Sequence, residues 1–138
     1  MISSLHVATG GVAGALAGSR AGALALGPLL HLAGDLTPHW DIRSRRYEIV
    51  SAGAAALAIA VRHGPFSPAT LGALAAAAPD LEHVLRLPRP GGRKLFPSHR
   101  RAGWHVSGGL STSAQLFAAG VLIGGLLSSP RRPPASST

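Results

Sequence analysis

Apolar residues form long runs that are separated by short groups of charged and polar residues. Read between the charges, these runs predict five helices. Their bounds are Leu5–Gly18, Ala21–Leu36, Tyr47–Val61, Pro68–Leu85 and Ala102–Leu127. The runs are rich in Ala and Gly, and aromatic residues, which favour strands, make up only 4% of the chain. The pattern therefore predicts an all-α helical bundle.

The composition indicates that this bundle does not expose an ordinary surface to water. Hydrophobic residues make up 46% of the 138 residues and charged residues 13%, whereas about 25% of the residues in soluble domains are charged. The last run has no charged residue between Arg101 and Arg131, which is longer than the roughly 20 residues that span a bilayer. We therefore expect a polytopic membrane bundle in contact with membrane lipids. The alternative is a water-soluble bundle rich in alanine.

Glycine spacing supports close packing of the shorter predicted helices. Gly10, Gly14 and Gly18 follow one another at four-residue intervals, as in membrane helices that approach closely, and Gly120 and Gly124 repeat this spacing. We expect one helical membrane domain over residues 1–129. Residues 130–138, which are rich in Pro and Ser, are expected to form a disordered tail.

The basic residues predict an orientation for this bundle. If all five helices span the membrane, nine Lys and Arg residues fall in the loops on one side and four on the other. The nine are Arg43, Arg45, Arg46, Arg86, Arg89, Arg93, Lys94, Arg100 and Arg101, and the four are Arg20, Arg62, Arg131 and Arg132. The positive-inside rule then predicts a multi-pass protein of the bacterial inner membrane with a cytoplasmic N-terminus.

The net charge of +8 raises the question of nucleic-acid binding. The basic residues lie in short clusters, and one Tyr and two Trp are too few for a platform on which bases stack. We therefore expect no nucleic-acid partner. The chain has no Cys, so a metal site has to use His and carboxylate ligands.

Histidines and acids are clustered along the chain. The clusters are His31, Asp35, His39 and Asp41; Asp80, Glu82 and His83; and His99 with His105. In the five-span arrangement all of them and His6 lie toward one side, whereas His63 lies at the opposite end and is expected to be an ordinary loop residue. His31, Asp35 and His39 share one helical face if the helix continues past Pro38. Such a set favours a divalent metal, with zinc expected first and manganese or iron as alternatives. Buried ion pairs are the other interpretation.

These motifs carry a resemblance to a known family. The stretch His31-Leu-Ala-Gly-Asp35-Leu-Thr-Pro-His39-Trp-Asp41 resembles small bacterial membrane proteins with an H-x-x-x-D-x-x-P-H-W-D motif. Together with Pro79-Asp80-Leu-Glu82-His83 and the segment from His99 to His105, it is similar to the membrane-bound metal-dependent hydrolase-like family, and more distantly to zinc-dependent phospholipase C. The H-x-x-x-D element precedes the other two motifs here and follows them in that family.

The resemblance implies specific roles for these residues. It implies His31, Asp35, Asp80 and His105 as metal ligands, and His6, His83 and His99 as ligands or as their hydrogen-bond partners. Glu82 would be a general base that accepts a proton from a water molecule polarised by the metal. The alternative for Glu82 is an ion pair with Arg86, one helical turn later.

Other polar residues have two interpretations each. Arg100 and Arg101 either bind a phosphate group or determine membrane orientation. Asp41 is expected to pair with Arg45 if a helix continues there. Trp40 and Trp104 are expected to be interfacial anchors.

We therefore expect a metal-dependent hydrolase that acts on a phosphoester or a lipid-derived substrate. The alternative is a small subunit of a larger membrane complex, in which the histidines bind pigment, haem or a structural ion. Acids interleaved with the histidines favour the enzyme, since haem requires a single axial His. The short chain favours the subunit, with copies of itself or other membrane proteins as candidate partners. A carrier of metal ions or protons is a third class, and ligands confined to one side argue against it.

Overall fold

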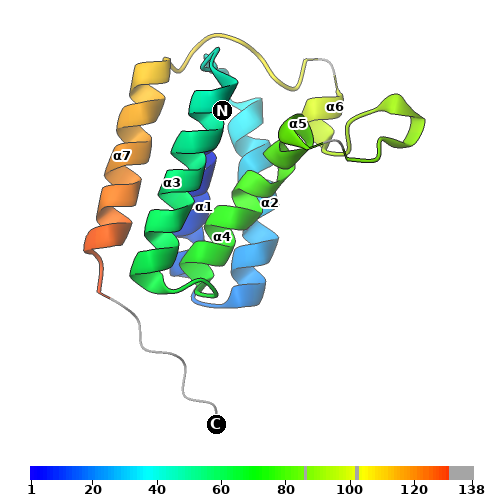
Figure 1. Ribbon diagram of the computed structural model, residues 1–138. Coiled ribbons are helices and arrows are strands. Elements are labelled where there is room, and N and C mark those ends of the chain that lie inside the picture. Colours follow the sequence, from blue (N-terminus) through cyan, green and yellow to red (C-terminus); the bar gives the residue numbers. More distant parts are fainter. Residues whose placement is uncertain (86, 102, 131–138) are drawn as a thin grey trace.

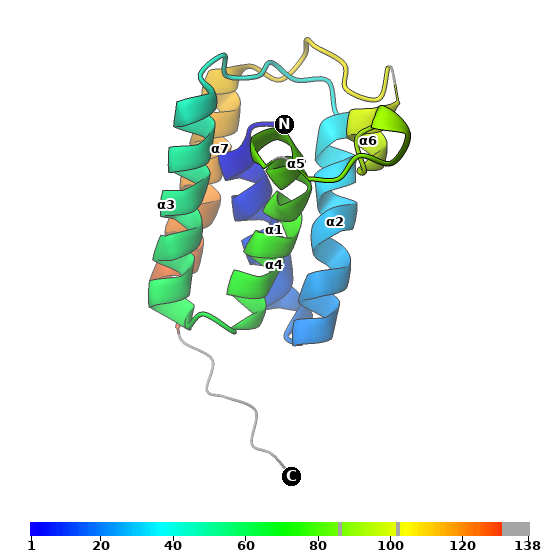
Figure 2. The same ribbon diagram turned by 45° about the vertical axis from the view of Figure 1, so that its right-hand side comes forward.

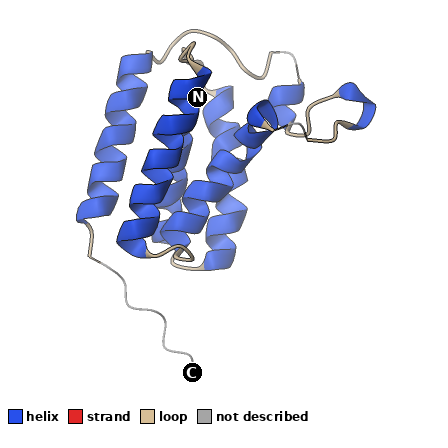
Figure 3. Ribbon diagram, viewed as in Figure 1, coloured by secondary structure: helices blue, strands red, loops and turns tan. Residues whose placement is uncertain are grey.

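Five long helices form an up-and-down bundle in the computed structural model, which describes residues 1–85, 87–101 and 103–130 (Figure 1). The helices are α1 (Ser3–Ala17), α2 (Arg20–Leu36), α3 (Arg45–His63), α4 (Pro68–Ala77) and α7 (Thr112–Ser128). Between α4 and α7 lie η1 (Ala78–Asp80), α5 (Leu81–Val84), η2 (Pro90–Gly92) and α6 (Pro97–Arg100). The described residues contain no strand, so the all-α prediction is confirmed (Figure 3).

Serine caps fix the first residue of four of the long helices. Each serine side chain accepts a hydrogen bond from the backbone N–H three residues later, which satisfies a donor that has no partner inside the helix. The capping residues are Ser19, Ser44, Ser67 and Ser111, before α2, α3, α4 and α7. These caps explain why the helices begin close to the predicted positions in α2, α3 and α4.

The last helix is much shorter than predicted. It begins at Thr112 rather than at Ala102, which itself lies outside the described residues. Gly103, Gly108 and Gly109 adopt positive φ angles of 83°, 125° and 68°, a conformation that breaks a right-handed helix. The segment before Thr112 is therefore a loop that crosses one end of the bundle.

This shortening removes the basis for the membrane prediction. Among the described residues, no helix combines the length and apolar character that crossing a bilayer requires. α7 has 17 residues, and α3, with 19, carries Arg45, Arg46, Glu48 and Arg62. The predictions of a polytopic membrane bundle and of a multi-pass inner-membrane protein with a cytoplasmic N-terminus are therefore wrong. The predicted disordered tail, apart from Pro130, lies outside the described residues.

α1 is the central helix, in contact with α2, α3, α4 and α7 (Figure 2). Gly10 and Gly14 lie against α4, where an added Cβ on either would overlap the backbone carbonyl of Gly72 or Pro68. The predicted close packing at this stripe is therefore present between α1 and α4. Gly18 instead ends α1 with a φ of 67°. The second predicted stripe, Gly120 and Gly124 in α7, faces open space, because a Cβ added at either glycine would meet no atom of another element within 4 Å.

The predicted helix from Pro68 to Leu85 is interrupted in the structure. α4 ends at Ala77, and the chain continues as η1 and α5. Pro79 has no N–H to donate to the preceding turn, which favours an end of the α-helix there. The interruption places Asp80, Glu82 and His83 on short elements at the end of the bundle.

Candidate metal centre

Six of the seven histidines gather at one end of the bundle, where α1 begins and α2 ends (Figure 1). They form four overlapping groups of three residues whose ligand atoms lie within 4.8 Å of one another. The groups are His6, His31 and Asp80; His31, Asp35 and His99; Asp35, His39 and His105; and Asp80, His83 and His99. His63 lies apart from them, at the opposite end of α3, and donates its Nε2–H to the Leu126 carbonyl (2.9 Å). The residues therefore are positioned to hold a metal ion.

One of these groups joins His31, Asp35 and His99. His31 Nε2 lies 3.1 Å from Asp35 Oδ2 and 3.3 Å from His99 Nε2, and the third side, His99 Nε2 to Asp35 Oδ2, is 3.2 Å. Ligand atoms at 2.0–2.1 Å from a tetrahedral zinc ion are about 3.3 Å apart. The three atoms therefore have the spacing of one face of a zinc coordination tetrahedron.

Both imidazole rings of this triangle are oriented through their other nitrogen. The Nδ1–H of His31 donates to the carbonyl oxygen of Ala76 (2.7 Å), and the Nδ1–H of His99 donates to Glu82 Oε1 (2.5 Å). Such partners fix the ring and its tautomer in metal sites. Nε2 of each ring is thereby left for Asp35 or for a metal ion.

Asp35 is enclosed at the centre of the group. Its Oδ2 accepts a hydrogen bond from the Ser98 hydroxyl (2.7 Å), and only 2% of the residue is exposed. Burial alone would raise the pKa of Asp35, but hydrogen bonds with His31, His6 and His99 hold it well below its usual range. The carboxylate is therefore ionised at neutral pH, as a metal ligand has to be.

Glu82 does not face open space. Its Oε2 accepts the N–H of Leu95 (2.6 Å), and its Oε1 accepts the N–H of Phe96 (3.3 Å) as well as that of His99. Burial would raise the pKa of Glu82, yet the hydrogen bonds from Leu95, His99 and Phe96 lower it. For His99, burial would lower the pKa, but hydrogen bonds with Asp35 and Glu82 raise it. This geometry fits a role for Glu82 in orienting the His99 ring. Arg86, the other predicted partner of Glu82, lies outside the described residues.

Asp80 approaches the triangle from the open side. Its Oδ1 lies 3.7 Å from Nε2 of both His31 and His99, its Oδ2 accepts the Ser3 hydroxyl hydrogen (2.8 Å), and 22% of its side chain is exposed. His83 lies farther out, with its ring 4.2 Å from that of His99. Burial lowers the pKa of His83, which accepts a hydrogen bond from Lys94 Nζ at 3.0 Å.

His6 lies beneath the triangle and is completely buried. Its ring stacks on that of His31 with 3.9 Å between centroids, and its Nε2 lies 3.1 Å from Asp35 Oδ1. Its Nδ1 is buried without a hydrogen-bond partner. Burial lowers the pKa of His6 to about 4. The ring is therefore neutral at pH 7.

His39 and His105 form a second pair beside this group. α2 ends at Leu36, so His39 lies in a loop and not on the predicted helical face. That loop pairs with the segment after His105, since the Trp40 N–H donates to the Leu110 carbonyl (3.0 Å). The Nε2 atoms of His39 and His105 are 3.1 Å apart.

Asp41 joins the second pair instead of the predicted partner Arg45. Its Oδ1 lies 3.1 Å from His39 Nε2, and this contact, together with the nearby His105, lowers the pKa of Asp41. The predicted pairing assumed a helix that includes residue 41. α3 begins only at Arg45, whose guanidinium donates to the His83 carbonyl.

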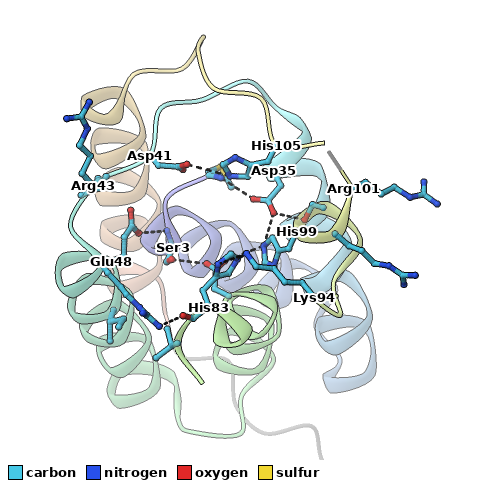
Figure 4. A pocket seen from close by; sticks show the side chains of 18 of the residues that line it. Ser3, Asp35, Asp41, Arg43, Glu48, His83, Lys94, His99, Arg101 and His105 are labelled. Atoms are coloured by element: carbon cyan, nitrogen blue, oxygen red, sulfur yellow. Dashed lines mark hydrogen bonds and ion pairs between the residues drawn. The ribbon is translucent and has the colours of Figure 1, made fainter. Parts of the chain in front are cut away.

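A cavity of about 650 Å³ opens beside the triangle of His31, Asp35 and His99 and the pair of His39 and His105 (Figure 4). Its lining includes Asp35, Asp80, His99 and His105, together with Arg43, Arg45, Lys94, Arg100 and Arg101. Figure 4 shows Arg43 and Arg101 extending outward from the central carboxylates and imidazoles. Arg101 stacks over the Trp104 ring at 4.5 Å. The cavity thus combines candidate metal ligands with a basic rim.

Several residues of the site carry no clear sequence signal. Glu48, in the first turn of α3, lines the cavity and accepts the Ser3 N–H (2.8 Å); burial raises its pKa. Ser98 contacts Asp35 although no spacing rule points to it. His39 belongs to the motif quoted above, which could have identified it as a ligand.

Comparison with known proteins adds no relative. The chain matches no protein-family model, no curated protein and no solved structure. The assignment of a function therefore rests on the residues and geometry of the metal centre.

Proposed function

We propose that the protein is a zinc-dependent hydrolase of phosphoesters. The observation that carries this proposal is the triangle of His31 Nε2, Asp35 Oδ2 and His99 Nε2, whose 3.1–3.3 Å sides fit zinc and which adjoins an open cavity. The motifs of the chain also resemble those of the membrane-bound metal-dependent hydrolase-like family, and that resemblance likewise implies metal-dependent hydrolysis.

In this proposal His31, Asp35 and His99 hold the ion and Glu82 orients His99. Zinc in such a site lowers the pKa of a water molecule and polarises a phosphoryl oxygen. Asp80 accepts the proton of the attacking water, because it is partly exposed on the cavity side and its Oδ1 lies farther from the imidazoles than the triangle atoms lie from one another. Glu82 is less suited to this role, since both of its oxygens are occupied.

The basic rim supports an anionic substrate. Among the residues that the structure describes, five Lys or Arg side chains line the cavity: Arg43, Arg45, Lys94, Arg100 and Arg101. Guanidinium groups bind phosphate through paired hydrogen bonds. Rotation of Arg100 or Arg101 toward the cavity would bring such a group to the substrate. The earlier alternative for these residues, membrane orientation, has lost its basis with the membrane prediction.

The test is hydrolysis of a panel of phosphomonoesters, phosphodiesters and carboxylic esters by the zinc-loaded full chain. We expect turnover of phosphoesters that a chelator abolishes and zinc restores. Asp80→Asn should retain zinc and lose turnover, whereas Arg100→Ala should raise KM for phosphoesters. His63→Ala is the matched control, because His63 lies at the other end of the bundle.

A structural ion is the competing function for the same residues. A structural zinc is closed by four protein ligands, whereas a catalytic zinc keeps an open position. Asp80 would be the fourth ligand in that case. Loss of zinc from Asp80→Asn, with no turnover of the panel by the wild type, would therefore contradict the hydrolase proposal and support a structural ion.

A further inference from the structure

We infer that the centre binds two divalent ions, with the Asp35 carboxylate as the bridge between them. This inference rests on the proposed function for the first ion, at His31 and His99. The second ion would be held by Asp35, His39 and His105, with Asp41 beside them.

The two oxygens of Asp35 face different neighbours. Oδ2 belongs to the triangle with His31 and His99 and accepts the Ser98 hydroxyl hydrogen. Oδ1 lies 3.1 Å from the α-amino nitrogen of Met1, which also contacts His39 Nε2. Oδ1 is therefore directed toward the side of the cluster that His39 occupies, as a bridging carboxylate requires.

The second donor set has the spacing of a coordination sphere. Asp35, His39 and His105 each offer an atom within 4.8 Å of the others. His39 Nε2 lies 3.1 Å from both His105 Nε2 and Asp41 Oδ1, close to the separation of about 3.3 Å for ligands of tetrahedral zinc. Asp41 Oδ2 is 3.7 Å from His105 Nε2. The two imidazoles and the Asp35 carboxylate thus form one candidate ligand set, and Asp41 lies beside it.

The tautomer of His39 is fixed in the same manner as those of the first group. Its Nδ1–H donates to the Thr37 carbonyl (2.6 Å), so Nε2 is the nitrogen available to an ion. The Met1 α-amino group contacts both Asp35 Oδ1 and His39 Nε2, so it would move aside when an ion binds there. The cavity adjoins this second set through Asp41 and His105.

Two ions in this arrangement narrow the substrate class of the proposed hydrolase. Paired ions about 3.5–4 Å apart stabilise both the entering and the leaving oxygen in phosphoryl displacement. A bridging carboxylate sets that separation. The inference therefore favours phosphoesters over carboxylic esters, in agreement with the basic rim.

The test is the number of metal ions bound per chain. The full chain is loaded with zinc or Mn²⁺, desalted, and analysed by elemental analysis. We expect about two ions in the wild type, about one in His105→Gln, and loss of both in Asp35→Asn, because only Asp35 belongs to both sets. His63→Gln is the control and should match the wild type. With Mn²⁺, the wild type should give the electron paramagnetic resonance signal of a spin-coupled pair, and His105→Gln that of an isolated ion.

A further variant guards against loss of folding. Asp41 is 51% exposed, so Asp41→Asn should fold normally, as checked by circular dichroism, and weaken binding of one ion only. The two-ion inference would be overturned if the wild type bound one ion that His31→Gln lost and that His105→Gln and Asp41→Asn retained. The proposed function would then stand. In that case the positive charge of the Met1 α-amino group would balance the negative charge of the second set. Absence of any bound metal would overturn both.

Discussion

Glu82→Gln separates the two roles considered for this residue. Three N–H donors, from Leu95, Phe96 and His99, converge on the two oxygens of the Glu82 carboxylate. A glutamine has one oxygen and one NH₂ group, so at least one of these donors would face another donor. An unsatisfied buried donor costs about 1–3 kcal/mol. The variant should therefore be less stable than the wild type by about this amount.

The effect on metal binding follows from the contact with His99. Groups that orient a ligating histidine contribute roughly 10- to 100-fold to metal affinity, or about 1.4–2.7 kcal/mol. We expect Glu82→Gln to weaken zinc binding by this factor and to regain turnover at saturating zinc. The assay is a competition between the protein and a chromophoric chelator at neutral pH, followed by hydrolysis of the best phosphoester.

The matched control is Glu48→Gln. Glu48 lines the same cavity, but its carboxylate accepts a hydrogen bond from the Ser3 backbone and not from an imidazole. The zinc affinity of Glu48→Gln should therefore change much less. Equal zinc affinity in Glu82→Gln and the wild type would refute the orienting role. If turnover were also lost at full zinc occupancy, Glu82 would be the general base that the sequence suggested.

Three further predictions concern stability. Gly14→Ala should lower the free energy of unfolding by about 1–3 kcal/mol in urea titrations, because its methyl group overlaps the Pro68 carbonyl; Gly124→Ala, with open space around it, should not destabilise, and equal effects would refute this packing argument. His6 has a pKa of about 4 in the fold and 6.5 when unfolded, so the metal-free protein should lose stability as the pH falls from 6.5 toward 4, by up to about 3 kcal/mol. His6→Gln should flatten this pH profile, and an unchanged profile would exclude His6 as its cause. Zinc at a hundredfold excess over its Kd should stabilise the wild type by about 2.7 kcal/mol, measured by thermal denaturation. Asp35→Asn should show no such stabilisation. An equal shift in both proteins would mean that the ion binds elsewhere.

The helices and the clustering of polar residues could be predicted because both depend on local patterns. α2 differs from its prediction by one residue at its start, since Ser19 caps it, and the six clustered histidines do meet at one end of the bundle. The membrane prediction failed because the apolar run after Arg101 was counted as one helix. Gly103, Gly108 and Gly109 interrupt it through backbone angles that a hydropathy pattern does not contain.

The finer geometry of the centre depends on contacts between distant segments. Glu82 and His99 are 17 residues apart, and Asp35 and Ser98 are 63 apart. The sequence places acids near histidines but does not tell which carboxylate orients a ring and which one faces the cavity. Asp41 shows the same limit, since its expected partner Arg45 was chosen by helical spacing in a segment that is not helical.

A metal ion held by the triangle would also cross-link distant segments of the chain. The chain has no Cys and therefore no disulfide that could do so. His31 and His99 are 68 residues apart. A cross-link that closes a loop of this length lowers the entropy of the unfolded chain and so raises its free energy by about 4 kcal/mol at 25 °C. An ion shared by α2 and α6 would act as such a cross-link and fasten the short elements to the long helices. Its removal should therefore increase amide hydrogen exchange from Leu95 to Arg101 before the five long helices separate, and exchange that rises equally throughout the bundle would contradict this.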